Sequence, residues 1–290
     1  LGETFEYWRL KLVNESDRPR KLAVFSFCEF ANNWDTRQDT VNLQYSLFIV
    51  KGQRLDNGLL RIAIHDKLIE QANAPQGANA TDGAVAEGDL PQCTWMGLVG
   101  APVTGYDTSR EAFLGTYGGY DHPHAVESGR CSDSDAYGDN ACGALQTELT
   151  LQPGESREVM ILLGIGDART TGVETMEEFG SFERADIEFE KLKQSWHAKL
   201  GQMVVDTPDE ELNHSVNVWG LYNCLITYNW SRAASLVYNG ERDGLGYRDS
   251  VQDVLGVLTA IPEDARDRLE LMLTGQVQNG GAIPVIKPFD

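Results

Sequence analysis

The sequence has no long hydrophobic run and few basic residues. No stretch approaches the roughly 18 to 20 apolar residues that a transmembrane helix needs. Lys and Arg together number 24, against 44 Asp and Glu, which gives a formal net charge of -20. This charge argues against a nucleic-acid partner, because phosphate backbones need a basic surface, and against an anionic membrane surface. A small anionic substrate is still compatible with it if arginines gather locally.

Cysteine is scarce and unevenly spaced. The five residues are Cys28, Cys93, Cys131, Cys142 and Cys224. An odd number at irregular spacing favours reduced thiols in a cytoplasmic protein, although a Cys131–Cys142 bridge is conceivable. The chain begins at Leu1 inside a strand-like pattern and ends without a closing element. We therefore interpret it as an internal fragment, incomplete at its N-terminus and truncated at its C-terminus.

What the sequence does contain is typical of a globular chain, with 41% hydrophobic and 23% charged residues. Apolar and polar residues alternate in "TFEYWRLKLV" and "RKLAVFSFCEF" around "NESDRPR", which indicates a hairpin. "ALQTELTL" and "REVMILLGIG" around "QPGES" indicate another. Many strands without a helical pattern predict an antiparallel β-sandwich over residues 1–170. Within it, residues 101–143 are rich in Gly, Asp, Ser and Tyr and are predicted to be a long functional loop.

The period changes near residue 172. Apolar residues then recur every three or four positions from Met176 to Leu200, the pattern of one long amphipathic helix. We expect a helical linker over residues 171–205 and a helical domain over 206–290. Thr207 is the predicted N-cap of its first helix, with Pro208 and Glu210 completing the start signal, and two more helices are expected at about 250–260 and 262–274. The fold class is therefore mixed and multidomain.

The stretch "GLGYRDSVQD" places Arg248 and Asp249 side by side just before the predicted helix. Ser250 and Asp253 have the spacing of a capping box, which would put the charged pair at a helix N-terminus. Such a position suits an anion, and an arginine there can hold phosphate as a planar fork. The carboxylate can accept hydrogen bonds from two neighbouring sugar hydroxyls. The plain alternative is a local surface ion pair.

Two more arginines precede this pair, Arg232 in "NWSRAAS" and Arg242 in "NGERDGLG". Arginines that cluster among glycines and aromatics, in a chain with a large acidic excess, indicate an anion site. A solvated loop is the alternative reading.

Three other sets of residues are weaker candidates. The set His122, His124, Cys131 and Cys142 does not have a standard zinc spacing. "DSDAYGD" lacks the bidentate Glu of a calcium loop, and no metal site is expected. Trp219 and Trp230 are expected in the core rather than as sugar platforms.

The block from "YNCLITYNWSRAAS" through "GERDGLGYRDSVQDVLGVL" to "GQVQNGGA" closely resembles glycoside hydrolase family 94, the inverting cellobiose and related disaccharide phosphorylases. "GYDTSREAFLGTYGGYDHPHAVESGRC" and "CGALQTELTLQPGE" also resemble this family. The resemblance covers about residues 5–283. It implies an N-terminal β-sandwich, a helical linker and the start of an (α/α)6 barrel.

Carried over by position, the resemblance implies that Arg232, Arg242 and Asp249 bind the non-reducing sugar and that Arg248 contacts phosphate. It also implies that the general acid is an Asp in a later segment, expected after Asp290, so no catalytic residue is assigned within the chain. In the family, loops such as 101–143 help to complete the active site of a homodimer.

The implied reaction is inverting phosphorolysis of a β-linked glucosyl disaccharide to α-glucose 1-phosphate. Inorganic phosphate is the co-substrate and no cofactor is needed. Cellobiose is the first substrate expected. The stretch "GGAIPVIKPF" differs from "GGAYHQYQPL" of the cellobiose enzymes, so cellobionic acid or another oligosaccharide is the alternative. A hydrolase on the same barrel and a non-catalytic carbohydrate-binding module are the rivals.

Overall fold

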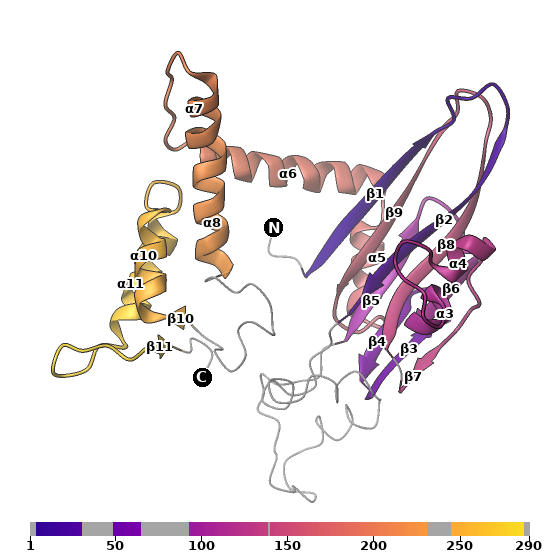
Figure 1. Ribbon diagram of the computed structural model, residues 1–290, viewed down its shortest axis with the longest axis horizontal. Helices are drawn as coiled ribbons and strands as arrows, with labels where there is room; N and C mark the ends of the chain where they lie inside the picture. The colour runs from indigo at the N-terminus through magenta and orange to yellow at the C-terminus, as the bar shows by residue number, and fades with distance from the viewer. Residues whose placement is uncertain (1–3, 31–48, 65–92, 139, 231–244, 287–290) are drawn as a thin grey trace, which may run out of the picture. The chain divides into compact units, whose positions relative to one another are not determined.

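The computed structural model describes residues 4–30, 49–64, 93–138, 140–230 and 245–286 (Figure 1). The chain divides into two compact units, Leu1–Ile187 and Glu188–Asp290. The first is built of two antiparallel β-sheets with helices on their outer faces, and the second is mainly helical. The predicted order of a β-sandwich followed by a helical domain is confirmed.

The larger sheet of the first unit has six antiparallel strands. In spatial order they are β1 (Phe5–Val13), β9 (Ser156–Ile165), β5 (Thr94–Val99), β4 (Leu60–Ile64), β3 (Val50–Arg54) and β7 (Ala136–Tyr137). The smaller sheet has the order β2 (Arg20–Glu29), β8 (Ala141–Leu151) and β6 (Gly105–Ser109). Alternate residues of the facing strands fill the space between the sheets, among them Leu60, Ile62, Met96, Leu145 and Ile161.

Both predicted hairpins are wrong. β1 pairs with β9 and β2 pairs with β8, so each connection passes from one sheet to the other. The two connections are joined at Asn14, whose N–H donates to the Glu155 carbonyl (2.9 Å) and whose carbonyl accepts from the Gly154 N–H (2.8 Å). The buried Asn14 amide also donates to the Leu151 carbonyl at 3.0 Å. Alternation reports which face of a strand is buried, and it says nothing of the partner strand.

The segment predicted as a long loop is ordered. It contains β6, the short helices α3 (Arg110–Leu114) and α4 (His124–Ser128), and β7. The buried Asp107 carboxylate organises it by accepting the backbone N–H and hydroxyl hydrogen bonds of Ser132 and Ser134. The ring of Phe113 stacks on Phe27 with ring centroids 4.7 Å apart. Gly and Asp serve here as turn formers between short elements.

All five cysteines are free thiols, and the conceivable Cys131–Cys142 bridge does not form. Burial raises the pKa of the Cys28 thiol to about 11 and also raises the pKa of Cys131. Thiols of this kind are poor nucleophiles at neutral pH, so these two serve as small apolar packing groups.

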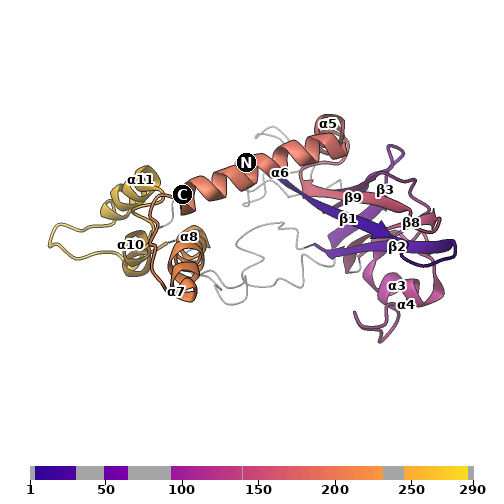
Figure 2. The same cartoon turned by 90° about the horizontal axis from the view of Figure 1, so that it is seen from above.

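The predicted long helix is two helices, α5 (Thr171–Phe179) and α6 (Phe182–Leu200). A Cβ at Gly180 would lie 2.2 Å from the Met176 carbonyl oxygen, so the bend between them requires glycine. The Ser181 hydroxyl accepts from the Arg184 N–H at 3.1 Å and starts α6. Figure 2 shows α5 on the face of the larger sheet that is turned away from β2, α3 and α4. Trp95, Leu162 and Phe179 pack in this layer.

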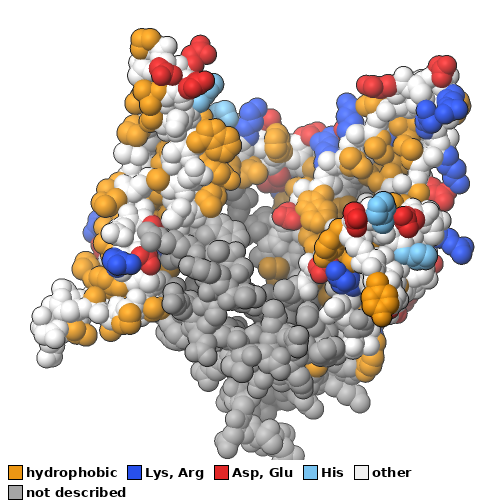
Figure 3. All heavy atoms as spheres, viewed as in Figure 1, with side chains coloured by type: hydrophobic (Ala, Val, Ile, Leu, Met, Phe, Trp, Pro, Cys, Tyr) orange, Lys and Arg blue, Asp and Glu red, His pale blue; other side chains and the backbone are white. Residues whose placement is uncertain are grey.

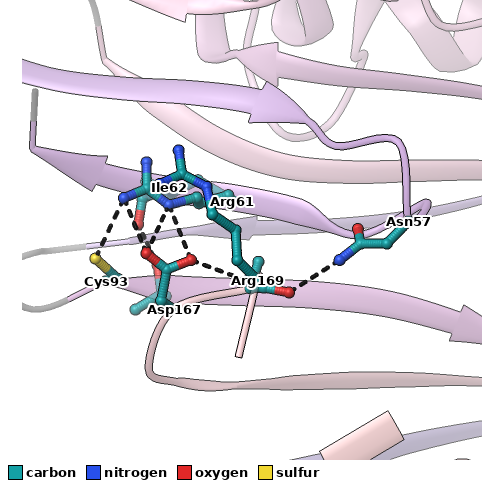
Figure 4. A network of polar contacts seen from close by, with 8 residues as sticks. Asn57, Arg61, Ile62, Cys93, Asp167 and Arg169 are labelled. Carbon is teal, nitrogen blue, oxygen red and sulfur yellow. Dashed lines mark hydrogen bonds and ion pairs between the residues drawn. The ribbon is translucent and has the colours of Figure 1, made fainter. Parts of the chain in front are cut away.

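An ion pair between a buried arginine and a half-buried aspartate joins β4 to the turn before α5 (Figure 4). The Arg61 Nε lies 3.2 Å from both Asp167 carboxylate oxygens, and its Nη2 lies 3.1 Å from Oδ2. Burial raises the pKa of Asp167, but hydrogen bonds from the Arg169 N–H and from Arg61 outweigh that effect and hold the pKa below its ordinary value. The carboxylate therefore stays ionised opposite a guanidinium that is only 1% exposed.

The second unit packs its helices around Leu221, Leu225, Tyr228, Val254 and Val257. Its elements are α7 (Glu210–His214), the π-helix η1 (Ser215–Gly220), α8 (Leu221–Trp230), α10 (Tyr247–Leu255), α11 (Pro262–Leu273), and the ribbon of β10 (Leu245–Gly246) with β11 (Val285–Ile286). None of the helices in the described part of the chain is both long and apolar enough to cross a membrane.

Two expectations for this unit are corrected. The N-cap of α7 is Asp209 rather than Thr207, because its carboxylate accepts from the Leu212 N–H at 3.0 Å. Trp219 is 61% exposed rather than in the core. The expectation for Trp230 falls on a side chain outside the described residues. Figure 3 shows hydrophobic side chains at the surface of this unit; those with large exposed fractions include Leu212, Val218 and Trp219.

Candidate sugar and phosphate site

The structure describes two of the four predicted site residues. Arg248 and Asp249 occupy the first turn of α10, which begins at Tyr247 with Gly246 as its N-cap. Arg232 and Arg242 lie outside the described residues. The predicted capping box at Ser250 and Asp253 is wrong, because Ser250 is 1% exposed within the helix and Asp253 lies a turn further on. Arg248 and Asp249 are therefore held by helical backbone rather than by the preceding loop.

The Arg248–Asp249 ion pair is loose. The Arg248 Nε lies 3.5 Å from the Asp249 Oδ1, and the two side chains are 84% and 36% exposed. Exposed pairs of this geometry contribute little to stability. The guanidinium can therefore turn to another anion at small cost, as a phosphate ligand must.

The side of α10 opposite Arg248 anchors it in the unit. Ser250 and Val254 are buried there. A Cβ at Gly256 would lie 2.7 Å from the Cys224 sulfur of α8, so the close approach of these helices requires glycine. Asp249 thus stands on an element that is fixed by packing, which suits a residue that must orient a sugar.

The N-terminus of α10 is also fixed by β11, which lies about 40 residues further along the sequence. Leu245 pairs with Ile286 and Gly246 pairs with Val285 in an antiparallel ribbon. The Tyr247 N–H, the first of the helix, donates to the Pro284 carbonyl at 3.0 Å. The sequence does not reveal Gly246, Pro284 and Val285 as part of this site. The only signal is that "GGAIPVIKPF" departs from the pattern of the related enzymes.

Gly246 brings Asp249 close to the ribbon. A Cβ built on Gly246 would lie 3.3 Å from the Asp249 Oδ2 and 3.7 Å from its Cβ. The carboxylate therefore lies against the bare backbone of Gly246, on one face of the β10–β11 ribbon. A larger residue at this position would push the carboxylate away.

The segment between α3 and α4 presents a second group of polar and aromatic side chains. The Tyr120 hydroxyl donates to the Glu29 carboxylate at 2.5 Å, and the Arg110 Nε donates to the same oxygen at 2.8 Å. Tyr117 is fully exposed on left-handed backbone, with a φ of 63°. These contacts hold the loop in one shape while its tip faces outward.

Among the described residues, no group of three or more His, Cys, Asp or Glu side chains could hold a metal ion. The first turn of α10 offers a guanidinium and a carboxylate, groups that suit phosphate and sugar hydroxyls.

Family models match both parts of the chain. The supersandwich domain of glycosyl hydrolase 94 matches residues 1–182, and the catalytic domain of the glycosyl hydrolase 94 superfamily matches residues 195–290. The chain belongs to glycoside hydrolase family 94. The resemblance seen in the sequence is confirmed.

Three curated relatives of this family 94 chain are named as phosphorylases. An N,N'-diacetylchitobiose phosphorylase of Vibrio furnissii is 32% identical, over 99% of this chain and 33% of the relative. A solabiose phosphorylase of Paenibacillus borealis is 28% identical, over 98% and 33%. A cellobionic acid phosphorylase of Neurospora crassa is 24% identical, over 96% and 31%. The chain spans about a third of the length of these relatives.

Proposed function

We propose that the full-length protein catalyses inverting phosphorolysis of a β-linked disaccharide. Family membership supports the reaction class, because the relatives that match nearly the whole chain, an N,N'-diacetylchitobiose phosphorylase and a solabiose phosphorylase among them, are named as phosphorylases. The single observation on the site that supports it is the first turn of α10. There an exposed arginine with a loose partner stands beside a carboxylate fixed against Gly246.

The proposed chemistry needs few groups. An oxygen of inorganic phosphate attacks the anomeric carbon and forms the new C–O–P bond as the glycosidic C–O bond breaks. A carboxylic acid gives its proton to the leaving oxygen, and we assign this role to an Asp outside residues 1–290. No catalytic base is required, because phosphate is already an anion.

Each proposed ligand has a separate task. Arg248 holds the attacking phosphate through a charge-assisted fork and offsets the acidic field of the protein. Asp249 accepts hydrogen bonds from hydroxyls of the non-reducing sugar, and Arg232 and Arg242 complete that subsite. Hydroxyl contacts that tighten in the oxocarbenium-like transition state lower the barrier.

The disaccharide is proposed as a class. The relatives' names include N,N'-diacetylchitobiose, solabiose and cellobionic acid. Cellobiose, the first expectation from the sequence, is in none of these three names. We therefore propose a β-linked disaccharide with a gluco-configured non-reducing sugar, bearing either a 2-hydroxyl or a 2-acetamido group.

The assembly and location are proposed with the activity. We propose a homodimer in which the exposed Tyr117 contacts the second copy. The free thiols support a cytoplasmic location. No cofactor other than the co-substrate phosphate is proposed.

A phosphate-dependence assay tests this function. Purified full-length protein is incubated with cellobiose, cellobionic acid, N,N'-diacetylchitobiose or solabiose, with and without inorganic phosphate. We expect at least one of these sugars to give a sugar 1-phosphate, and only when inorganic phosphate is present. Equal cleavage without phosphate would identify a hydrolase. Binding of these sugars without cleavage would identify a non-catalytic carbohydrate-binding protein.

A further inference from the structure

The β10–β11 ribbon has two different faces at the mouth of α10. Residues directly opposite each other in an antiparallel pair project their side chains to the same face. Successive residues project to opposite faces. Val285 is opposite Gly246, and Ile286 is opposite Leu245. Val285 and Ile286 therefore point to different sides of the ribbon.

Ile286 lies on the core face. It is 6% exposed, and its Cδ1 is 2.8 Å from the position that a Cβ on Gly275 would take, just past the end of α11. Val285 projects to the other face and is only half-buried. Its position is therefore not explained by the helical core.

The position that a Cβ on Gly246 would take shows which side chain lies on the same face as Val285. The nearest atoms to a Cβ on Gly246 are the Oδ2, Cβ and Cγ of Asp249, at 3.3, 3.7 and 3.8 Å. Opposite Cβ positions in such a ribbon are about 4.5 to 5.5 Å apart. The branched side chain of Val285 thus stands on the same face as the Asp249 carboxylate, one strand away.

We propose that Val285 is a specificity-determining residue for the sugar that Asp249 binds. The proposal rests on the proposed function, in which Asp249 accepts sugar hydroxyls. A sugar held by that carboxylate has Val285 beside it as an apolar wall without a hydrogen-bond donor or acceptor. Val285 therefore limits the size and polarity of the ring substituent next to those hydroxyls, which separates a hydroxyl from an acetamido group.

The expected changes follow from the size and polarity of this wall. Val285→Ala removes two methyl groups and makes room, so it favours the acetamido sugar over the hydroxyl sugar. One methyl or methylene in such a pocket typically alters selectivity by about 10-fold or more. Val285→Thr keeps the shape and replaces one methyl group with a hydroxyl, so it shifts preference toward the hydroxyl sugar.

The test uses the full-length protein with two readouts. One is kcat/KM for phosphorolysis of cellobiose against N,N'-diacetylchitobiose, and the other is calorimetric affinity for glucose against N-acetylglucosamine. Val277→Ala is the matched control, because Val277 is an exposed valine of the same unit outside this ribbon. Val285→Thr guards against a folding defect, since it conserves the side-chain shape.

We expect Val285→Ala to shift at least one ratio about 10-fold toward the acetamido sugar, with the KM for phosphate unchanged. Ratios that move no more than in Val277→Ala overturn the proposal, as does an equal loss with both sugars. Absence of phosphorolysis with a shifted affinity ratio refutes the proposed function and supports the role of Val285. Absence of any sugar binding overturns both.

Discussion

Removing either partner of the Arg61–Asp167 pair should lower the stability of the fold, but loss of Asp167 should cost more than loss of Arg61. Asp167→Asn keeps the size of the side chain and removes its charge. The Arg61 guanidinium is 1% exposed, so it would lose the carboxylate that neutralises it while remaining buried. Arg61→Met instead leaves a carboxylate that is 29% exposed and still accepts the Arg169 N–H at 2.9 Å.

The geometry sets the magnitude. Three hydrogen bonds of 3.1 to 3.2 Å join the two groups. Breaking a buried pair from one side typically costs about 3 to 5 kcal/mol. We expect the cost of Asp167→Asn to fall in that range. Arg61→Met should cost about 1 to 2 kcal/mol, because the Asp167 carboxylate that it leaves unpaired reaches solvent.

Native-state hydrogen exchange of the backbone amides of β4 and β5 measures the loss of stability around the pair. A loss of about 3 kcal/mol makes their exchange roughly 100-fold faster. Glu148→Gln is the control, since it breaks the exposed Lys21–Glu148 pair and should change exchange by less than about 0.5 kcal/mol. The reasoning is refuted if Asp167→Asn perturbs these amides no more than Glu148→Gln, or less than Arg61→Met.

The pH dependence has a definite sign. The folded-state pKa of Asp167 is lowered, so its contribution is complete above the unfolded value of about 3.9 and is lost as pH falls through the folded pKa. The difference in exchange between the native protein and Asp167→Asn should stay constant from neutral pH to about pH 5 and shrink in more acidic solution.

Three further predictions concern the site and the sandwich. In the full-length enzyme, Arg248→Ala should raise the KM for phosphate roughly 10- to 100-fold with little change for the disaccharide, and Arg248→Lys should recover little; an unchanged phosphate KM would return the pair to a surface ion pair. Asp249→Asn should lower kcat/KM for the disaccharide while the phosphate KM holds, and steady-state kinetics with each substrate varied separates the two. Asn14→Ala should cost about 1 to 3 kcal/mol in urea denaturation, because it removes the side-chain amide that donates to both the Leu151 and the Arg18 carbonyls; an unchanged denaturation midpoint would contradict this.

The sequence predicts strands and helices well where one face of an element is buried. β9 is expected from its apolar residues, of which Ile161 and Leu163 face one core cluster and Met160 and Leu162 the other, and α11 starts at Pro262 as expected. Partner choice is a different matter, because a turn such as "QPGES" can close a hairpin or cross between sheets. The crossing at Asn14 depends on hydrogen bonds between two distant turns.

The candidate site is predictable in its residue types and less so in its geometry. The cluster of arginines and Asp249 stands out by composition alone. The start of α10 three residues before Ser250 depends on the pairing of Gly246 with Val285 and on the hydrogen bond from the Tyr247 N–H to Pro284, which no local capping rule contains. The bend at Gly180 and Ser181 did have a local signal, a glycine followed by a capping serine, within a continuous apolar stripe.

The most direct test of the proposed function is the anomeric form of the first product. Full-length protein, a β-linked disaccharide that it cleaves and inorganic phosphate are followed by proton and phosphorus NMR from the first minutes. Inverting phosphorolysis predicts an α-sugar 1-phosphate that forms in step with the released acceptor sugar. A β-sugar 1-phosphate, or free sugar formed at a rate independent of phosphate, would contradict it.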